Sequence, residues 1–175
     1  MANPLPRDPI ADAQRNWERS GWGNTAAPMA AITAIMRTQQ ILLARIENVL
    51  KPFGLTFARY ELLALLSFAR TGALPMNKAS ALLQVHPTSV TNAVDRLEKS
   101  GLVVRSPHPT DGRTTLVELT TEGRTMAKRA TAALNNEVFS QSGFADDDVE
   151  HLIRIFGSFR RRAGDFNDVD DLSTR

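Results

Sequence analysis

The sequence predicts a mainly α-helical protein with a small β-hairpin wing, in which a winged helix-turn-helix domain joins a helical dimerisation lobe. Two observations support this fold class. Residues 74–120 indicate a short helix, a tight turn, a second helix, and two strands connected by a loop with a basic tip. On both sides of that stretch, apolar residues recur at helical spacing over long segments.

Composition limits the class of protein. The chain has 175 residues, of which 42% are apolar, so it can build the core of one domain or of a small two-lobed one. The formal net charge of +2 permits binding to nucleic acid without requiring it. The absence of cysteine excludes disulfides, a thiolate nucleophile and a thiol-based oxidant sensor. No apolar run approaches the length of a membrane span, and the N-terminus lacks the apolar segment of a signal peptide. We therefore expect a cytoplasmic protein with no membrane partner.

Residues 1–27 are expected to form an N-terminal extension with one short helix, at about residues 9–20. Asp8 followed by proline is typical of a helix start, and Gly21 is placed to end the helix. Trp17 lies on the apolar face of this helix. It either anchors the helix by packing or lines a small-molecule pocket.

Residues 28–55, together with residues 121–163, are predicted to form the dimerisation lobe. A broad apolar side runs along a long helix that we expect from Pro28 to Lys51. A second helix, from about Thr56 to Ala69, opens the winged helix-turn-helix domain, which we assign to residues 56–120. Its leucines point to more than one side, so we expect burial against several neighbours.

The second helix of the helix-turn-helix motif, from about Pro87 to Ser100, is the predicted recognition helix. Its ends are well marked, because proline suits the first helical position and a glycine follows the last. Val90, Val94 and Leu97 recur at i, i+4 and i+7, so they share one face, and that face must be buried.

Short polar side chains occupy the exposed side near the start of this helix: Thr88, Ser89, Thr91 and Asn92. Such side chains let a helix backbone approach base edges in a major groove. Asparagine can bond adenine bidentately, and a threonine methyl can touch the thymine methyl. We therefore predict that these four residues contact DNA bases. The alternative is ordinary polar surface at the start of a helix.

A hairpin is predicted after the recognition helix, since Thr110, Asp111 and Gly112 are typical of a turn between two strands. Arg113 would project from its tip, where a guanidinium can reach phosphates or a narrow minor groove. Arg96, on the flank of the recognition helix, either contacts a phosphate or pairs with a neighbouring carboxylate.

The run SVTNAVDRLEKSGLVVR, followed by PTDGRTTLVELTTEG, resembles the MarR family of bacterial transcriptional regulators in motif content and spacing. The flanking helical segments extend the resemblance over about residues 28–163. It implies a homodimer that binds a pseudo-palindromic operator in double-stranded DNA, and repression relieved by a small aromatic or phenolic ligand. Two positions depart from the family pattern: Gln84 stands where a turn glycine is usual, and His86 where a serine or threonine cap is usual.

The resemblance also implies two candidate ligand-binding residues. Some urate-responsive members of the family carry an N-terminal helix with a tryptophan, paired with an aspartate on the helix before the helix-turn-helix. Trp17 matches the tryptophan. Glu61 stands at the place of the aspartate, where it keeps the charge but puts the carboxylate farther from the backbone.

Two amphipathic helices are predicted after the wing, one from Thr121 to about Ser140 and one from about Asp146 to Arg162, with Gly143 between them. Aspartates at the start and arginines at the end of the last helix suit its dipole. The apolar stripes are too large to stay exposed, so we expect them to bury against a second copy of the chain in a homodimer. Residues 164–175 are expected to be a disordered acidic tail.

No residue pattern of an enzyme or a metalloprotein is present. His86, His108 and His151 lack the spacing of metal ligands, and no set of nucleophile and base is recognisable. We therefore expect no catalytic residue, metal or cofactor. Two alternatives to a ligand-responsive repressor stay open: a ligand-independent architectural DNA-binding protein, and a winged-helix protein-interaction module. The small polar residues and the basic wing tip favour DNA, because a docking surface would expose apolar side chains there.

Overall fold

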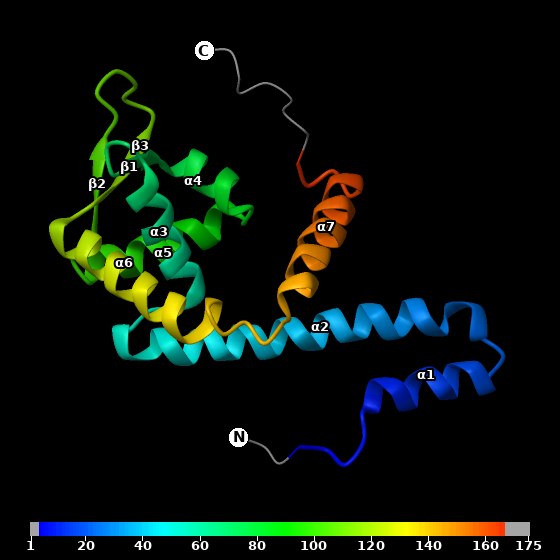
Figure 1. Cartoon of the computed structure of the whole chain (residues 1–175). Helices are drawn as coiled ribbons and strands as arrows, with labels where there is room; N and C mark the ends of the chain where they lie inside the picture. Colours follow the sequence, from blue (N-terminus) through cyan, green and yellow to red (C-terminus); the bar gives the residue numbers. More distant parts are fainter. Residues whose placement is uncertain (1–3, 167–175) are drawn as a thin grey trace. The chain divides into compact units, whose positions relative to one another are not determined.

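The computed structural model describes residues 4–166, which fall into two compact units divided between Val138 and Phe139 (Figure 1). The first unit contains, in chain order, α1 (Pro9–Arg19), α2 (Gly23–Leu50), a 3-10 turn (Lys51–Phe53), α3 (Phe57–Phe68), β1 (Ala73–Pro75), α4 (Met76–Leu83), α5 (Pro87–Lys99), β2 (Val103–Pro107), β3 (Thr115–Leu119) and α6 (Thr121–Leu134). A π-helical turn (Asn135–Phe139) crosses the boundary. The second unit contains α7 (Asp146–Arg162). The predicted fold class, mainly helical with a small wing, is confirmed.

Helix α1 has the bounds that the sequence predicts. The Asp8 carboxylate caps it by accepting a hydrogen bond from the backbone N–H of Ile10 at 2.9 Å. Beyond its end, Gly21 has a φ of 85°, in the region that favours glycine. The helix packs along α2, and the ring of Trp17 meets the ring of Trp22 edge to face, with centroids 5.2 Å apart.

Helix α2 begins at Gly23, so the predicted start at Pro28 is wrong. Pro28 lies inside the helix. The missing N–H of a proline removes one backbone hydrogen bond, and the 28-residue helix continues past Pro28 to Leu50. The end of α2 is as predicted: a single 3-10 turn follows Leu50, and Gly54 closes it with a φ of 66°.

The core of the first unit lies where α3, α4, α5 and α6 pack against one another and the sheet. Its largest fully buried side chains are Leu50, Leu62, Leu63, Leu66, Leu97, Leu134, Val90, Val94, Val103 and Val117. They include the three residues assigned to the buried face of the recognition helix. Tyr60 on α3 adds a hydroxyl contact to Thr131 on α6 at 3.2 Å. This core fixes α5 through its apolar side and leaves the opposite side exposed.

Strands β2 and β3 form the predicted wing hairpin, and a third strand, β1, pairs with the other edge of β3. The antiparallel order is β1-β3-β2, so that Leu74 and Arg105 both lie opposite Val117. The sequence does not indicate β1, because three residues ending in proline have neither the length nor the composition of a strand.

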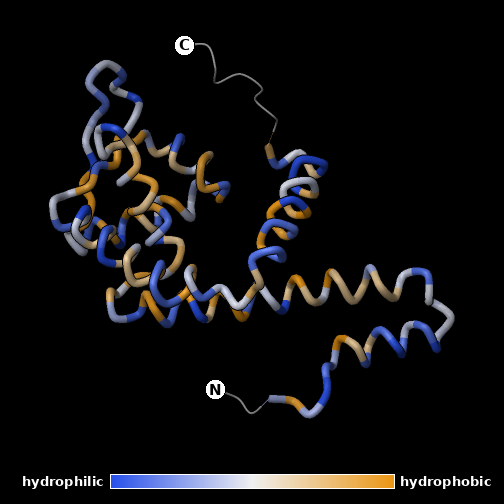
Figure 2. The backbone as a smooth tube through the Cα atoms, in the orientation of Figure 1, coloured by the Kyte–Doolittle hydropathy of each residue, from blue (hydrophilic) through white to orange (hydrophobic). Residues whose placement is uncertain are grey.

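The two C-terminal helices follow the predicted pattern. Helix α6 continues into the π-helical turn and so covers nearly all of the predicted segment up to Ser140. Helix α7 begins with three aspartates and ends with three arginines. Figure 2 shows hydrophobic and hydrophilic residues alternating along it. Most of the predicted acidic tail, residues 167–175, lies outside the described residues. Within residues 4–166 no helix combines the length and apolar composition needed to cross a membrane.

Candidate nucleic-acid interface

The turn before the recognition helix α5 accommodates both departures from the family pattern. Gln84 ends α4 in the left-handed region, with φ 53° and ψ 38°, which explains why glycine is usual at this position. The His86 side chain caps α5 in place of a hydroxyl: its Nδ1 accepts a hydrogen bond from the backbone N–H of Thr88 at 3.3 Å. The start of α5 therefore keeps a side-chain cap.

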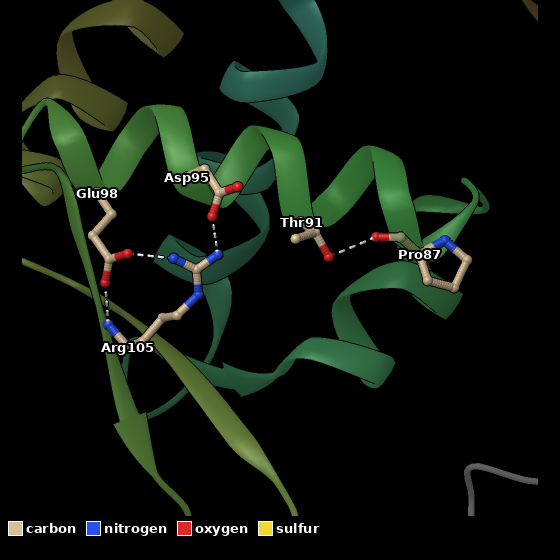
Figure 3. A network of polar contacts seen from close by, with 5 residues as sticks. All are labelled: Pro87, Thr91, Asp95, Glu98 and Arg105. Atoms are coloured by element: carbon tan, nitrogen blue, oxygen red, sulfur yellow. Dashed lines mark hydrogen bonds and ion pairs between the residues drawn. The ribbon is translucent and has the colours of Figure 1, made fainter.

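The polar side chains predicted to contact bases lie together on the exposed surface of α5. Thr88, Ser89, Thr91 and Asn92 are all exposed. The Thr91 hydroxyl donates to the Pro87 carbonyl at 3.1 Å, one turn earlier in the helix (Figure 3). This bond fixes the side-chain rotamer and leaves the oxygen lone pairs and the methyl group available to a ligand. The surface has the chemistry that base-edge contact requires.

Arg105, a residue for which the sequence suggested no role, joins strand β2 to the recognition helix. Its guanidinium pairs with Asp95 at 2.5 Å and with Glu98, and its backbone N–H donates to Glu98 at 3.0 Å (Figure 3). Burial lowers the pKa of Arg105, but the hydrogen bonds to the two carboxylates outweigh it and hold that pKa above its ordinary value.

Arg96 is exposed, and the carboxylates that were its alternative partners are engaged by Arg105 instead. Among residues 4–166, no ion pair involves Arg96. Its guanidinium is therefore available to a phosphate. Two carboxylates three residues apart, Asp95 and Glu98, were the sequence signal that a cation from another element packs there.

The wing tip is built around Asp111. Its carboxylate accepts hydrogen bonds from the Thr114 hydroxyl at 2.7 Å and from the backbone N–H of Arg113 at 3.1 Å. The hydroxyl bond, the backbone bond and the nearby His108 together hold the pKa of Asp111 below its ordinary value. The bond from the backbone N–H of His108 to the Thr114 carbonyl, at 3.0 Å, closes the loop. This frame presents the exposed Arg113 at the end of the hairpin.

The two candidate ligand residues are not brought together within one chain. Trp17 contacts Trp22, just before the start of α2, whereas Glu61 lies on α3, which follows the other end of α2 (Figure 1). Helix α2, which separates the two residues along the chain, has 28 residues and therefore spans about 42 Å. Burial raises the pKa of Glu61, as expected for a carboxylate that is partly removed from water. Among the described residues, no cluster of three or more acidic or histidine side chains could hold a metal ion.

Comparisons with known proteins agree with this architecture. A family model described as "MarR family" matches residues 53–114. A MarR family transcriptional regulator from Streptomyces coelicolor is 47% identical in sequence, with a TM-score of 0.74 over 81% of this chain and 99% of that one. The HTH-type transcriptional regulator PecS of Dickeya dadantii is 26% identical over 153 residues, which cover 85% of this chain and 90% of PecS.

A mutant MarR from Escherichia coli, solved in complex with operator DNA, shares the fold. It is 22% identical, with a TM-score of 0.70 over 77% of this chain and 96% of that one. The winged helix-turn-helix geometry, the exposed polar start of α5 and the extent of the Streptomyces match lead to one assignment. The chain belongs to the MarR family of DNA-binding transcriptional regulators and is not an enzyme.

Proposed function

We propose that the protein is a homodimeric repressor in the cytoplasm that binds a pseudo-palindromic operator and is released from it by a small aromatic or phenolic ligand. The observation that carries the proposal is the exposed polar start of α5 beside a wing that ends in an exposed arginine. A helix of this chemistry fits the major groove, while the wing arginine reaches the adjacent backbone or minor groove.

The proposed contacts divide into two classes. Thr88, Ser89, Thr91 and Asn92 contact base edges and so determine which sequence is bound. Arg96 and Arg113 contact phosphates or the minor groove and contribute affinity. The complex of Escherichia coli MarR with operator DNA supports this proposal by its shared fold.

A homodimer is proposed because large apolar side chains stay exposed on helices of both units. On α2 they are Ile32, Ile35, Met36 and Ile41, and on α7 they are Ile153, Ile155, Phe156 and Phe159. Exposed apolar surface of this extent favours association. A symmetric dimer would also supply two recognition helices, and half-sites about one helical turn apart would match its two-fold axis.

Ligand release is proposed from the family resemblance, with Trp17 and Glu61 as candidate contacts. Because one chain keeps these residues far apart, a pocket that uses both needs a second copy of the chain. Titration of the wild-type dimer and of Trp17→Ala with urate tests this idea. Wild-type binding that weakens in the variant supports it, and no binding by wild type removes these two residues from the proposal.

Selection of bound genomic fragments at physiological salt tests the DNA-binding part of the proposal. We expect the enriched fragments to share an inverted repeat with half-sites about one helical turn apart. Dispersed enrichment of AT-rich fragments would favour an architectural DNA-binding protein, and no enrichment would favour a protein-interaction module. Sedimentation at micromolar concentration tests the homodimer.

A further inference from the structure

Arg105 occupies the place where the wing strand β2 passes the recognition helix α5. Its side chain is 27% exposed, and its guanidinium and backbone N–H together donate to both Asp95 and Glu98. The neighbouring Ser106 hydroxyl donates to Glu118 on the paired strand β3. Hydrogen bonds and ion pairs therefore link the recognition helix α5 to β2, and a hydrogen bond links β2 to β3.

The two carboxylates lie beside the surface proposed to meet DNA. Thr91, Asp95 and Glu98 follow one another at i, i+4 and i+7, so they line one side of α5 (Figure 3). The carboxylate side chains keep 48% and 38% of their surface exposed. Duplex DNA carries about one negative charge per 1.7 Å of its axis. Unpaired carboxylates on this side of a recognition helix would repel the duplex.

We propose that Arg105 is a positioning residue for DNA binding that acts through Asp95 and Glu98. The proposal rests on DNA binding by α5. Arg105 offsets one of the two negative charges and holds both carboxylates against β2, so that the phosphates can approach α5. Because its donors are directed at the two carboxylates, Arg105 is not itself a phosphate contact.

Two other roles for Arg105 make different predictions. If Arg105 contacted a phosphate directly, its removal would weaken DNA binding whether or not the carboxylates were present. If it only stabilised the fold, its removal would lower the thermal midpoint and change DNA affinity in proportion. Partly exposed ion pairs contribute little to stability, so we expect a small change in the midpoint.

A double-mutant cycle separates these roles. The variants are Arg105→Gln, the pair Asp95→Asn with Glu98→Gln, and the triple variant. Each full-length protein is titrated with a genomic duplex selected by the wild type and with a shuffled duplex of equal length. We expect Arg105→Gln to weaken binding to both duplexes by about tenfold, comparable with the loss of one base contact. In the background without the carboxylates, the same substitution should change affinity by less than about twofold.

Two controls complete the design. Arg19→Gln removes an exposed charge from α1, far along the chain from the wing, and should leave DNA affinity within about twofold. Arg105→Lys keeps a cation beside the carboxylates and should lose no more than about threefold. Raising the salt concentration should reduce the loss of DNA affinity in Arg105→Gln, because salt screens the repulsion between the carboxylates and the phosphates.

Specific outcomes overturn the proposal. If Arg105→Gln lowers DNA affinity equally with and without the two carboxylates, Arg105 contacts a phosphate directly. If Arg105→Lys lowers DNA affinity as much as Arg105→Gln does, the charge of Arg105 has no role. Unchanged affinity in Arg105→Gln, or a loss that follows a fall in the thermal midpoint, also overturns it. Failure of the wild type to enrich any duplex would count against the proposed DNA-binding function instead.

Discussion

Two arginines on the wing are held in different ways, and the difference separates their roles. Arg105 is half-buried and bonded to two carboxylates. Arg113 is exposed: its backbone N–H is bonded to Asp111, and its guanidinium makes no ion pair among residues 4–166. An exposed guanidinium on a fixed backbone is suited to a phosphate or a narrow minor groove. Arg113 is therefore the wing residue expected to touch DNA.

Replacing Arg113 with alanine should weaken operator binding and flatten its dependence on salt. Removing one phosphate contact lowers the slope of log affinity against log salt by about one unit. The measurement is a fluorescence titration of the selected duplex at several salt concentrations. Arg19→Ala, an exposed change on α1, is the control and should leave the slope unchanged. An Arg113→Ala protein with wild-type affinity and slope would rule out the wing contact.

Replacing Thr114 with valine should raise the pKa of Asp111 toward its ordinary value. The Thr114 hydroxyl is the largest of the causes that depress this pKa, and valine keeps the shape without the donor. A depressed carboxylate pKa means that the wing-tip bonds stabilise the fold above the ordinary pKa, and that this contribution is lost as pH falls through the depressed value. NMR titration of the Asp111 carboxyl carbon measures the shift. Thr115→Val, on the exposed start of β3, should leave it unchanged.

The residues of the interface could be predicted to different degrees. Helical periodicity alone placed Val90, Val94 and Leu97 inside and the polar residues outside, because α5 has clear ends and one buried face. Turn chemistry placed Arg113 at the wing tip in the same way. The role of Arg105 was missed. Asp95 and Glu98 indicate that a cation packs beside them, but which cation does so depends on how β2 packs against α5, and local sequence patterns do not specify that contact.

Secondary structure elements with strong local signals were predicted well, and those that depend on distant partners were missed. Asp8 and Gly21 mark the ends of α1, a proline and a glycine mark those of α5, and aspartates and arginines mark those of α7. Strand β1 exists only because β3 supplies its partner, and Pro28 does not interrupt α2. Gln84 is a third case: its backbone keeps the left-handed conformation without glycine, which lowers the free energy of unfolding by about 1 kcal/mol.

The junction between the wing and α6 explains the glycine of the Leu-Thr-Thr-Glu-Gly run. Thr120 caps α6 by accepting from the Gly123 N–H at 2.9 Å, and its hydroxyl donates to the Gly101 carbonyl at 2.7 Å. This arrangement brings Gly123 so close to the start of β2 that an added Cβ would lie 1.9 Å from the Leu102 carbonyl oxygen. The glycine is needed for close approach of two backbones.

Gly123→Ala should therefore destabilise the protein by about 2–3 kcal/mol, since backbone must shift to admit the methyl group. Gly112→Ala is the matched control: a Cβ there meets nothing within 4 Å, so its effect should stay within about 0.5 kcal/mol. Urea unfolding followed by circular dichroism measures both. Equal stabilities for the two variants would contradict the close approach seen at Gly123.

At the scale of the whole molecule, two helices carry apolar side chains that their own units leave exposed. Helix α2 has 28 residues but only Ala26 and Leu50 are buried on it, and α7 has no buried residue. On α7, Ile153 and Phe159 are 69% and 64% exposed. The sequence predicted both helices and a second copy of the chain as the partner of their apolar stripes. It could not predict which residues of the two copies would meet, because a stripe does not specify the residues that it packs against.

If α7 joins a second copy of the chain, then Phe159→Glu should separate the dimer. A glutamate buried in an apolar interface must lose its hydration or its charge, and the loss of the aromatic side chain adds to this cost. We expect the dimer dissociation constant to rise by at least about thirtyfold, measured by sedimentation across the micromolar range. Arg154→Glu places the same side chain at an exposed position on the opposite side of α7, so it is the control and should remain dimeric.

The same variant links assembly to DNA binding. A monomer presents one recognition helix to one half-site and makes no contacts with the second, so operator affinity should fall much more than affinity for an isolated half-site. Comparing Phe159→Glu on duplexes with one and two half-sites measures this difference. A wild-type protein that sediments as a monomer would rule out the dimer. A Phe159→Glu protein that stays dimeric and binds normally would place the interface on other residues, of which the exposed apolar side chains of α2 are the next to test.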